Sequence, residues 1–121
     1  MVEKTGGVNG ISAVTLQTVD MARAVEFYES LGLTQHRGGP SAPFTSFSVG
    51  QQHVNLRLVE THSSAKNTLI IFRVDDVDEV YKRVISCHFT PEFPPRDADW
   101  GERYFHILDP DGNLLSFAQP L

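Results

Sequence analysis

The sequence has one cysteine, one tryptophan and no hydrophobic run long enough to span a membrane. A single thiol excludes an internal disulfide and any zinc site built from several cysteines. Cys87 lies near the end of an apolar helical pattern, where a packed small side chain is favoured over a catalytic thiol. A membrane span needs about 20 apolar residues, and residues 1–10 hold Gly, Asn and charge where a signal peptide would be hydrophobic. We therefore expect a cytoplasmic protein without membrane contact.

Basic clusters are also missing, and fifteen Asp and Glu outnumber ten Lys and Arg, which gives a formal charge of -5. Nucleic acid is therefore not an expected partner. The 121 residues, 40% of them hydrophobic and 21% charged, are typical of one globular domain. We expect a loose leader over residues 1–10 and a single domain over 11–121.

The first half of the chain predicts one strand, one helix and three further strands. Residues 11–19 alternate small or polar side chains with apolar ones, as a half-buried strand does. Asp20 is placed to cap a helix running to about Leu31, because its carboxylate can accept amide hydrogens of the first turn. The predicted buried stripe is Ala24, Val25, Tyr28 and Leu31, and the later strands span 33–37, 44–49 and 53–59.

The second half repeats this order after a polar connector at residues 60–67. Asp76 follows Asp20 at an offset of 56 residues and precedes a second amphipathic helix. A terminal hairpin is expected around the turn-forming residues 109–113. The predicted buried stripe of this helix is Val80, Tyr81, Val84 and Ile85. The predicted strands span 68–74, 103–108 and 114–118, and residues 96–102 are expected to form a loop. The two repeats cover about 11–60 and 68–119.

Three segments carry a resemblance to a known family: VDMARAVEFYESLGL, FRVDDVDEVYKRV at the repeat offset, and DWGERYFHILDPDGNLLSF. They are similar to the vicinal oxygen chelate superfamily, which includes glyoxalase I, bleomycin-resistance proteins, fosfomycin-resistance enzymes and extradiol dioxygenases. The resemblance implies an α+β fold in which two βαβββ modules form a curled mixed sheet around a cup-shaped cleft. It also implies a homodimer, in which such a cup is often completed.

Metal-dependent members of this superfamily hold a divalent ion through His or Glu side chains at matched strand positions. The matching positions here are Ala13, Leu69, Ser116 and a fourth near Asn55 or Arg57. None of these side chains is a carboxylate or an imidazole, and a divalent ion needs three or four such donors. We therefore expect neither the usual metal nor another cofactor.

Two of the five histidines are expected in the cup. His53 shares a strand face with Asn55 and Arg57, and the family register points His106 into the cup opposite Ser116. Either imidazole is a candidate general base, and the two together are candidates for a relocated metal site, although a cation would meet the charge of Arg57. The remaining histidines, His36, His62 and His88, are expected on the surface.

Strand alternation and the family register together predict a small-molecule pocket with apolar walls and few polar groups. Several pocket residues have two possible roles. Arg57 and Arg73 either bind ligand, or extend to solvent or pair with an acid across a dimer. Trp100 either covers the cleft or anchors a loop, and Tyr104 contacts either the ligand or the core. The expected ligand-binding residues are Thr15, Gln17, His53, Asn55, Arg57, Arg73, Trp100, Tyr104, His106 and Ser116.

The leading functional hypothesis is metal-free binding of an aromatic or anionic small molecule, similar to the bleomycin-resistance branch. The guanidinium groups of Arg57 and Arg73 favour an anionic ligand over bleomycin itself, which is cationic. The alternative is a lyase, isomerase or dioxygenase that uses His106 or His53 as general base or a relocated metal. A third hypothesis, a structural or regulatory partner protein, is supported by no sequence feature of its own.

Overall fold

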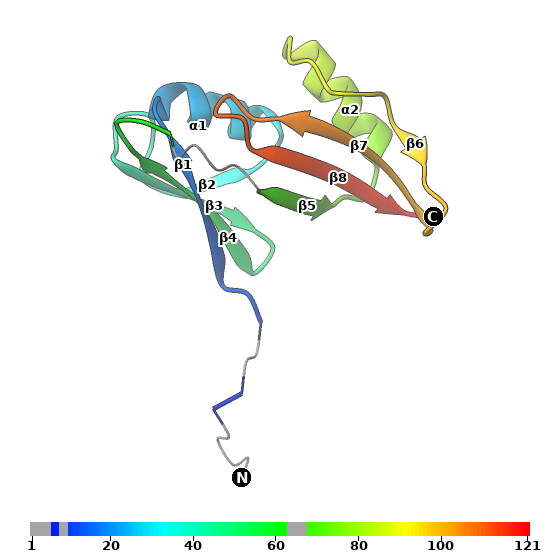
Figure 1. The fold of residues 1–121 in the computed structure, drawn as a ribbon, viewed down its shortest axis with the longest axis horizontal. Helices are drawn as coiled ribbons and strands as arrows, with labels where there is room; N and C mark the ends of the chain where they lie inside the picture. Colours follow the sequence, from blue (N-terminus) through cyan, green and yellow to red (C-terminus); the bar gives the residue numbers. More distant parts are fainter. Residues whose placement is uncertain (1–5, 8–9, 63–67) are drawn as a thin grey trace.

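The computed structural model describes residues 6–7, 10–62 and 68–121, and the chain folds as two βαβββ modules (Figure 1). The predicted leader and the connector between the repeats lie largely outside the described residues. The first module contains β1 (Ala13–Thr18), α1 (Met21–Ser30), β2 (Thr34–Arg37), β3 (Phe44–Val49) and β4 (Gln52–Leu58). The second contains β5 (Leu69–Arg73), α2 (Val77–Ser86), β6 (Arg96–Asp97), β7 (Glu102–Leu108) and β8 (Leu114–Pro120).

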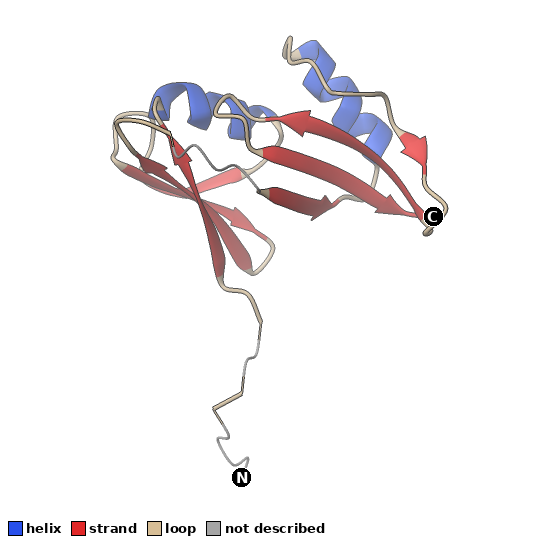
Figure 2. Cartoon of the chain, viewed as in Figure 1, coloured by secondary structure: helices blue, strands red, loops and turns tan. Residues whose placement is uncertain are grey.

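Each module forms one four-stranded mixed sheet with the same strand order. The orders are β1-β4-β3-β2 and β5-β8-β7-β6. In each sheet the first strand pairs parallel with the last, and the other pairings are antiparallel. Both helices lie on one side of these sheets in Figure 2. The predicted α+β class, with a curled sheet that does not close, is confirmed.

Matching aspartates cap the two helices, as their offset of 56 residues predicts. Asp20 Oδ1 accepts the backbone N–H of Arg23 at 3.1 Å, and Asp76 Oδ1 accepts that of Glu79 at 3.1 Å. Each bond satisfies an amide that a helix start leaves unpaired. The chain therefore fixes both helix starts locally.

The predicted buried stripe is confirmed for α1 and partly wrong for α2. All four predicted α1 stripe residues are buried. In α2 the stripe starts at Val77, which is fully buried, and passes through Val84, whereas Ile85 is 46% exposed. Ile85 is eight residues after Val77, so the two side chains are about 80° apart around the helix axis. Ile85 therefore sits at the margin of the stripe rather than within it.

The region predicted as a loop before the hairpin contains a short edge strand. Arg96 and Asp97 form β6, which pairs antiparallel with Tyr104 and Arg103 of β7. Two residues are too few for alternation to be visible in the sequence. The hairpin itself is longer than predicted, because it extends to Glu102 and Pro120.

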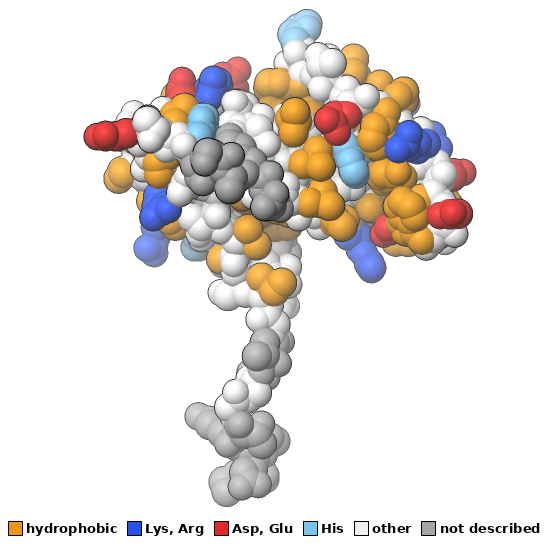
Figure 3. Space-filling view, viewed as in Figure 1, with side chains coloured by type: hydrophobic (Ala, Val, Ile, Leu, Met, Phe, Trp, Pro, Cys, Tyr) orange, Lys and Arg blue, Asp and Glu red, His pale blue; other side chains and the backbone are white. Residues whose placement is uncertain are grey.

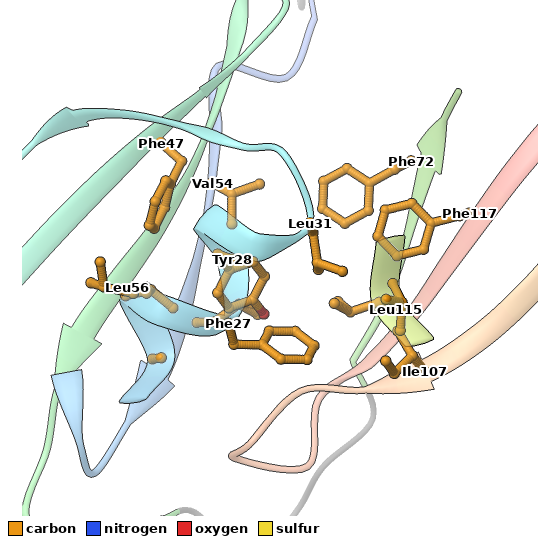
Figure 4. Close-up of a cluster of buried hydrophobic side chains, with 14 of the residues drawn as sticks. Phe27, Tyr28, Leu31, Phe47, Val54, Leu56, Phe72, Ile107, Leu115 and Phe117 are labelled. Carbon is orange, nitrogen blue, oxygen red and sulfur yellow. The ribbon is translucent and has the colours of Figure 1, made fainter. Parts of the chain in front are cut away.

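One hydrophobic core joins the modules, and α1 lies inside it. Figure 4 shows Phe27 and Tyr28 with Phe47 and Leu56 of the first sheet on one side and the side chains of the second sheet on the other. The Phe27 ring meets Phe89, which follows α2, edge to face at a centroid distance of 4.8 Å. Burial of α1 therefore stabilises both modules at once.

A buried hydrogen bond connects α1 to the turn between β7 and β8. The Tyr28 hydroxyl donates to Asp109 Oδ2 at 2.6 Å, and both side chains are buried. Asp109 also accepts the backbone N–H groups of Asp111 at 2.9 Å and Asn113 at 2.8 Å, and the Asn113 amide at 2.8 Å. Burial, and then the Asp109 charge, raise the pKa of Tyr28 well above its usual value, so its hydroxyl stays protonated and donates.

Asp111 of the same turn contacts three segments of the first half. Its Oδ1 accepts the backbone N–H of Val19 at 3.1 Å and lies 2.5 Å from His62 Nε2 and 3.5 Å from Arg23 Nη2. Burial acts to raise the pKa of Asp111, but the nearby Thr18 hydroxyl, His62 and the Val19 N–H outweigh it and lower the pKa. His62 is exposed, as expected, and it also forms a contact between the modules.

Neither described helix is long and apolar enough to cross a membrane.

We predict that Tyr28→Phe lowers the free energy of unfolding by about 2 kcal/mol, because Asp109 stays buried with one donor fewer. Urea unfolding at neutral pH measures the change. The matched control is Tyr81→Phe, because Tyr81 packs on Phe105 and its hydroxyl has no hydrogen-bond partner among the described residues. Equal losses in the two variants would contradict the role assigned to the Tyr28 hydroxyl.

Candidate functional site

The sheet faces turned away from the helices carry the predicted site residues. On the first sheet, Ala13, Thr15 and Gln17 of β1 stand opposite His53, Asn55 and Arg57 of β4. We call this surface, with the β3 side chains of the same parity, the polar face. Those β3 side chains, Phe44, Ser46 and Ser48, are paired in register with Arg57, Asn55 and His53. Alternation along β3 predicts that these three side chains share one face, but the sequence analysis did not count them among the site residues.

A polar row crosses the middle of the polar face. Arg37 of β2 is opposite Ser46, which is opposite Asn55, which is opposite Thr15. The Asn55 amide donates to the Thr15 hydroxyl at 3.2 Å. This hydrogen bond fixes the orientation of two predicted site residues and leaves the Arg37 end of the row available.

A β-bulge in β2 brings two neighbouring residues to the same hollow. Gln35 is opposite Phe47 and Arg37 is opposite Ser46, so His36 is an extra residue in the strand. The His36 ring lies 5.0 Å from the His53 ring, centroid to centroid. His36 is exposed, as expected, but its place in the site was missed, because regular alternation puts 36 and 37 on opposite faces. The hollow, of about 280 Å³, is lined by Ala13, His36, Arg37, Phe44, Ser46, His53 and Asn55.

The corresponding surface of the second sheet, which we call the aromatic face, has a different chemistry. His106 is opposite Ser116, as predicted, and Tyr104 is opposite Ala118. In the space-filling view, hydrophobic side chains gather over this part of the molecule (Figure 3). A hollow of about 240 Å³ is lined by Leu69, Ile71, Trp100, Glu102, Tyr104, His106, Ser116 and Ala118.

Ring contacts build this face from β7 and the loop before it. The Tyr104 ring lies 5.3 Å from both the Trp100 and His106 rings, centroid to centroid. Phe93 contacts Tyr104 and His106 at 5.5 and 5.1 Å, and the Arg96 guanidinium lies 3.8 Å above the Phe93 ring and donates to the Tyr104 hydroxyl. The rings therefore hold one another in place.

Trp100 has both of the roles that the sequence left open, because it anchors a loop and borders a hollow. Its indole N–H donates to Glu102 Oε1 at 2.9 Å, which anchors the loop. Its side chain nevertheless stays 63% exposed and lines the hollow. Trp100 is thus a fixed aromatic side chain at the edge of the hollow.

His106 has an electrostatic environment that favours its neutral form. Burial lowers the pKa of His106, and the charge of Arg96 acts in the same direction against the opposing effect of Glu92. A neutral imidazole at neutral pH has one nitrogen free to accept a hydrogen bond or a proton.

A third hollow, of about 480 Å³, is lined by residues of both sheets and shares lining residues with the other two. It shares His53 with the polar-face hollow, and Leu69 and Ile71 with the aromatic-face hollow. None of these three hollows is lined by both His53 and His106. The structure therefore places the two candidate bases in different hollows, and gives His53 a different imidazole neighbour, His36.

Four predicted ligand-binding residues lie outside the linings of these hollows: Thr15, Gln17, Arg57 and Arg73. Arg57 is opposite Gln17 and Phe44 at one end of the polar face, and Arg73 is opposite Ala118. Both arginines are exposed, and within the described part of the chain neither lies within 4.0 Å of a carboxylate oxygen.

The donor set does not fit the divalent metal of related enzymes. Ala13, Leu69 and Ser116 supply a methyl, an isobutyl and a hydroxymethyl group at the matching positions, and the fourth position falls near Asn55 or Arg57. In the ranges 6–7, 10–62 and 68–121, no three His, Cys, Asp or Glu side chains gather as a metal site would require.

We predict that NMR titration gives His106 a pKa below the ordinary histidine value, because burial disfavours the charged imidazole. Arg96→Gln should raise the His106 pKa, because it removes a neighbouring positive charge that opposes protonation. Lys82→Gln on α2 removes one charge elsewhere and should leave the value unchanged. A His106 pKa at or above the ordinary histidine value would contradict the effect assigned to burial.

Comparison with known proteins places the fold and the family. Crystal structures of TioX from Micromonospora sp. ML1 (TM-score 0.76, 25% identity, covering 93% of this chain and 100% of that one) and of lactoylglutathione lyase from Agrobacterium tumefaciens (0.74, 23%, 93% and 94%) share the architecture. The chain is 28% identical to the uncharacterized protein YraH of Bacillus subtilis (strain 168), over 89% of this chain and 96% of YraH. It is 37% identical to a bleomycin resistance protein of Geobacillus stearothermophilus over 49 residues, which cover 40% of this chain and 37% of that protein.

The sequence model of one family matches residues 10–117, nearly the whole chain, and the expected resemblance is thereby confirmed. The chain belongs to the Glyoxalase/Bleomycin resistance protein/Dioxygenase superfamily, the vicinal oxygen chelate group.

Proposed function

We propose that this protein binds an aromatic or anionic small organic molecule in the hollows of its two sheet faces, without a metal ion. The observation that carries the proposal is the lining of those hollows. Trp100, Tyr104 and Ile71 offer rings and apolar surface, and Arg37 offers a guanidinium group. Such a combination of apolar walls and few polar groups is typical of small-molecule sites.

The side chains at the family's metal positions support binding without a metal. A methyl, an isobutyl and a hydroxymethyl group cannot coordinate a divalent ion together. Sequestration of an organic molecule needs only a complementary surface. The loss of metal donors is therefore compatible with binding and removes the Lewis acid that the metal-dependent relatives use.

The match to a bleomycin resistance protein does not carry that drug to this chain. It covers 37% of that protein. The exposed guanidinium groups of Arg37, Arg57 and Arg73 favour a ligand of the opposite charge to cationic bleomycin. We propose an uncharged aromatic or an anionic ligand instead.

A homodimer is part of the proposal. Leu69, Ile71 and Leu108 of the second sheet are 50%, 62% and 48% exposed in the single chain. A second copy or a ligand that covered them would remove apolar surface from water. The oligomeric state and the cytoplasmic location both remain predictions.

We predict that aromatic acids quench the fluorescence of Trp100, the single tryptophan, when they bind beside it. Ile71→Gln should weaken binding about five-fold, because about 1 kcal/mol of apolar contact is lost. The control is Ile85→Gln, because Ile85 is also exposed but lies on α2, outside these hollows. A broad panel of aromatic and anionic compounds that neither changes the fluorescence nor raises the melting temperature would overturn the proposal.

One observation favours the enzyme alternative: His106 has a lowered pKa and lines a hollow, as a general base would. We predict that His106→Gln distinguishes the two functions once a ligand is known. In an enzyme the variant keeps most of the ligand affinity and loses turnover, measured by product formation. In a binding protein no turnover exists, and only the affinity changes.

A further inference from the structure

The bulged end of β2 is the part of the site with an excess of positive charge. Arg37 lines the polar-face hollow, and Arg57 is exposed on the same face. Among the described residues, no carboxylate oxygen lies within 4.0 Å of either guanidinium, and no Asp or Glu lines the hollow. The chain as a whole has five more acidic than basic residues. Uncompensated cations are therefore a local feature that the overall composition does not explain.

The backbone geometry of β2 brings several hydrogen-bond donors to the polar-face hollow. Because His36 is an extra residue in β2, both His36 and Arg37 border the hollow that also contains His53. Guanidinium N–H groups form two parallel hydrogen bonds to a carboxylate or a phosphate, and imidazole N–H groups can add a third. The Ser46 hydroxyl lies in the same lining. Each of these four groups can donate a hydrogen bond to an anion.

An aromatic side chain completes this end of the site. Phe44 lines the same hollow and is 40% exposed. It offers a ring face to the apolar part of a ligand whose charged group lies at Arg37. The hollow therefore combines donors for an anion with a surface for the ring that carries it.

We propose that the bulged β2 end, with Arg37 as its main donor and His36 and His53 beside it, recognises the carboxylate or phosphate group of an aromatic ligand. This inference rests on the proposed function and narrows the ligand class from aromatic or anionic to aromatic anions. It gives Arg37, rather than Arg57 or Arg73, the principal role in charge recognition.

The test uses three probes with the same ring: 2-naphthoate, 2-naphthyl phosphate and 2-naphthylmethanol. Each is titrated into the full chain labelled with ¹⁵N, and dissociation constants come from amide shifts of Ser46 and Asn55, with Trp100 fluorescence recorded in parallel. The anions should bind about ten-fold more tightly than the alcohol, a factor expected of one charge-assisted contact at a partly exposed site. Tighter binding of naphthoate assigns a carboxylic acid ligand, and tighter binding of naphthyl phosphate assigns a phosphate monoester.

Variants locate the preference. Arg37→Gln should bring both anions to the affinity of the alcohol while the alcohol itself is unaffected. Arg37→Lys, which keeps the charge but loses the paired N–H geometry, should retain part of the preference. Lys82→Gln removes one positive charge from α2, where the side chain is 72% exposed and pairs with Glu79, and should retain all of it. Arg37 is exposed, so thermal unfolding should match the parent chain.

Two results would overturn the inference in different ways. If the alcohol binds as tightly as the anions, or if Arg37→Gln keeps the anion preference, the β2 end is not the anion site, although the proposed function still stands. If none of the three probes changes either the amide shifts or the Trp100 signal, both this inference and the proposed binding of aromatic ligands fail.

Discussion

The hydrogen bond from Tyr28 to Asp109 is the contact on which the arrangement of the two modules depends. An ionised carboxylate buried in a hydrophobic core is costly unless every lone pair is used, and Asp109 uses its oxygens for the Tyr28 hydroxyl, two turn amides and the Asn113 side chain. The turn takes its shape from the same carboxylate, with Gly112 at a φ of +84° that a side chain rarely adopts. One group therefore shapes the β7–β8 connection and attaches α1 of the other module to it.

This attachment determines where the site faces lie. Because α1 is packed between side chains of both sheets, the opposite surfaces of the sheets remain open to ligand. A hollow lined by residues of both sheets shares His53 with the polar-face hollow and Ile71 with the aromatic-face hollow. The arginine and two imidazoles thus line one hollow, and Trp100 and Tyr104 line another. The positions that the family resemblance matches to metal ligands hold Ala13, Leu69 and Ser116, and the proposed binding therefore relies on the arginine, the imidazoles and the rings.

The two faces also differ in how their side chains are held. On the aromatic face, Trp100, Tyr104 and Arg96 are fixed by hydrogen bonds and ring contacts among themselves. On the polar face, the corresponding contacts among the described residues are the Asn55–Thr15 hydrogen bond and the His36–His53 ring contact, and Arg37 is exposed. A ligand that neutralises Arg37 would order a long side chain, which costs conformational entropy and lowers the affinity gained from the charge. The side chains proposed to contact a ring are therefore held in place before binding, whereas the exposed Arg37 side chain is not.

The sequence by itself determined the repeated modules, both helix caps, the stripe of α1 and the shared faces of Ala13, Thr15 and Gln17 and of His53, Asn55 and Arg57, because these follow from local hydrogen bonds and from alternation along strands. The pairing of His106 with Ser116 was expected from the family resemblance. The sequence could not give the β2 bulge, since one extra residue in a strand leaves no mark on composition, and so His36 and Arg37 were left out of the site. Nor could it place His53 and His106 relative to each other or show that Asp109 is buried against Tyr28. Those positions depend on how two sheets pack around one helix, and contacts between residues 81 apart in the chain are decided only when the whole core assembles.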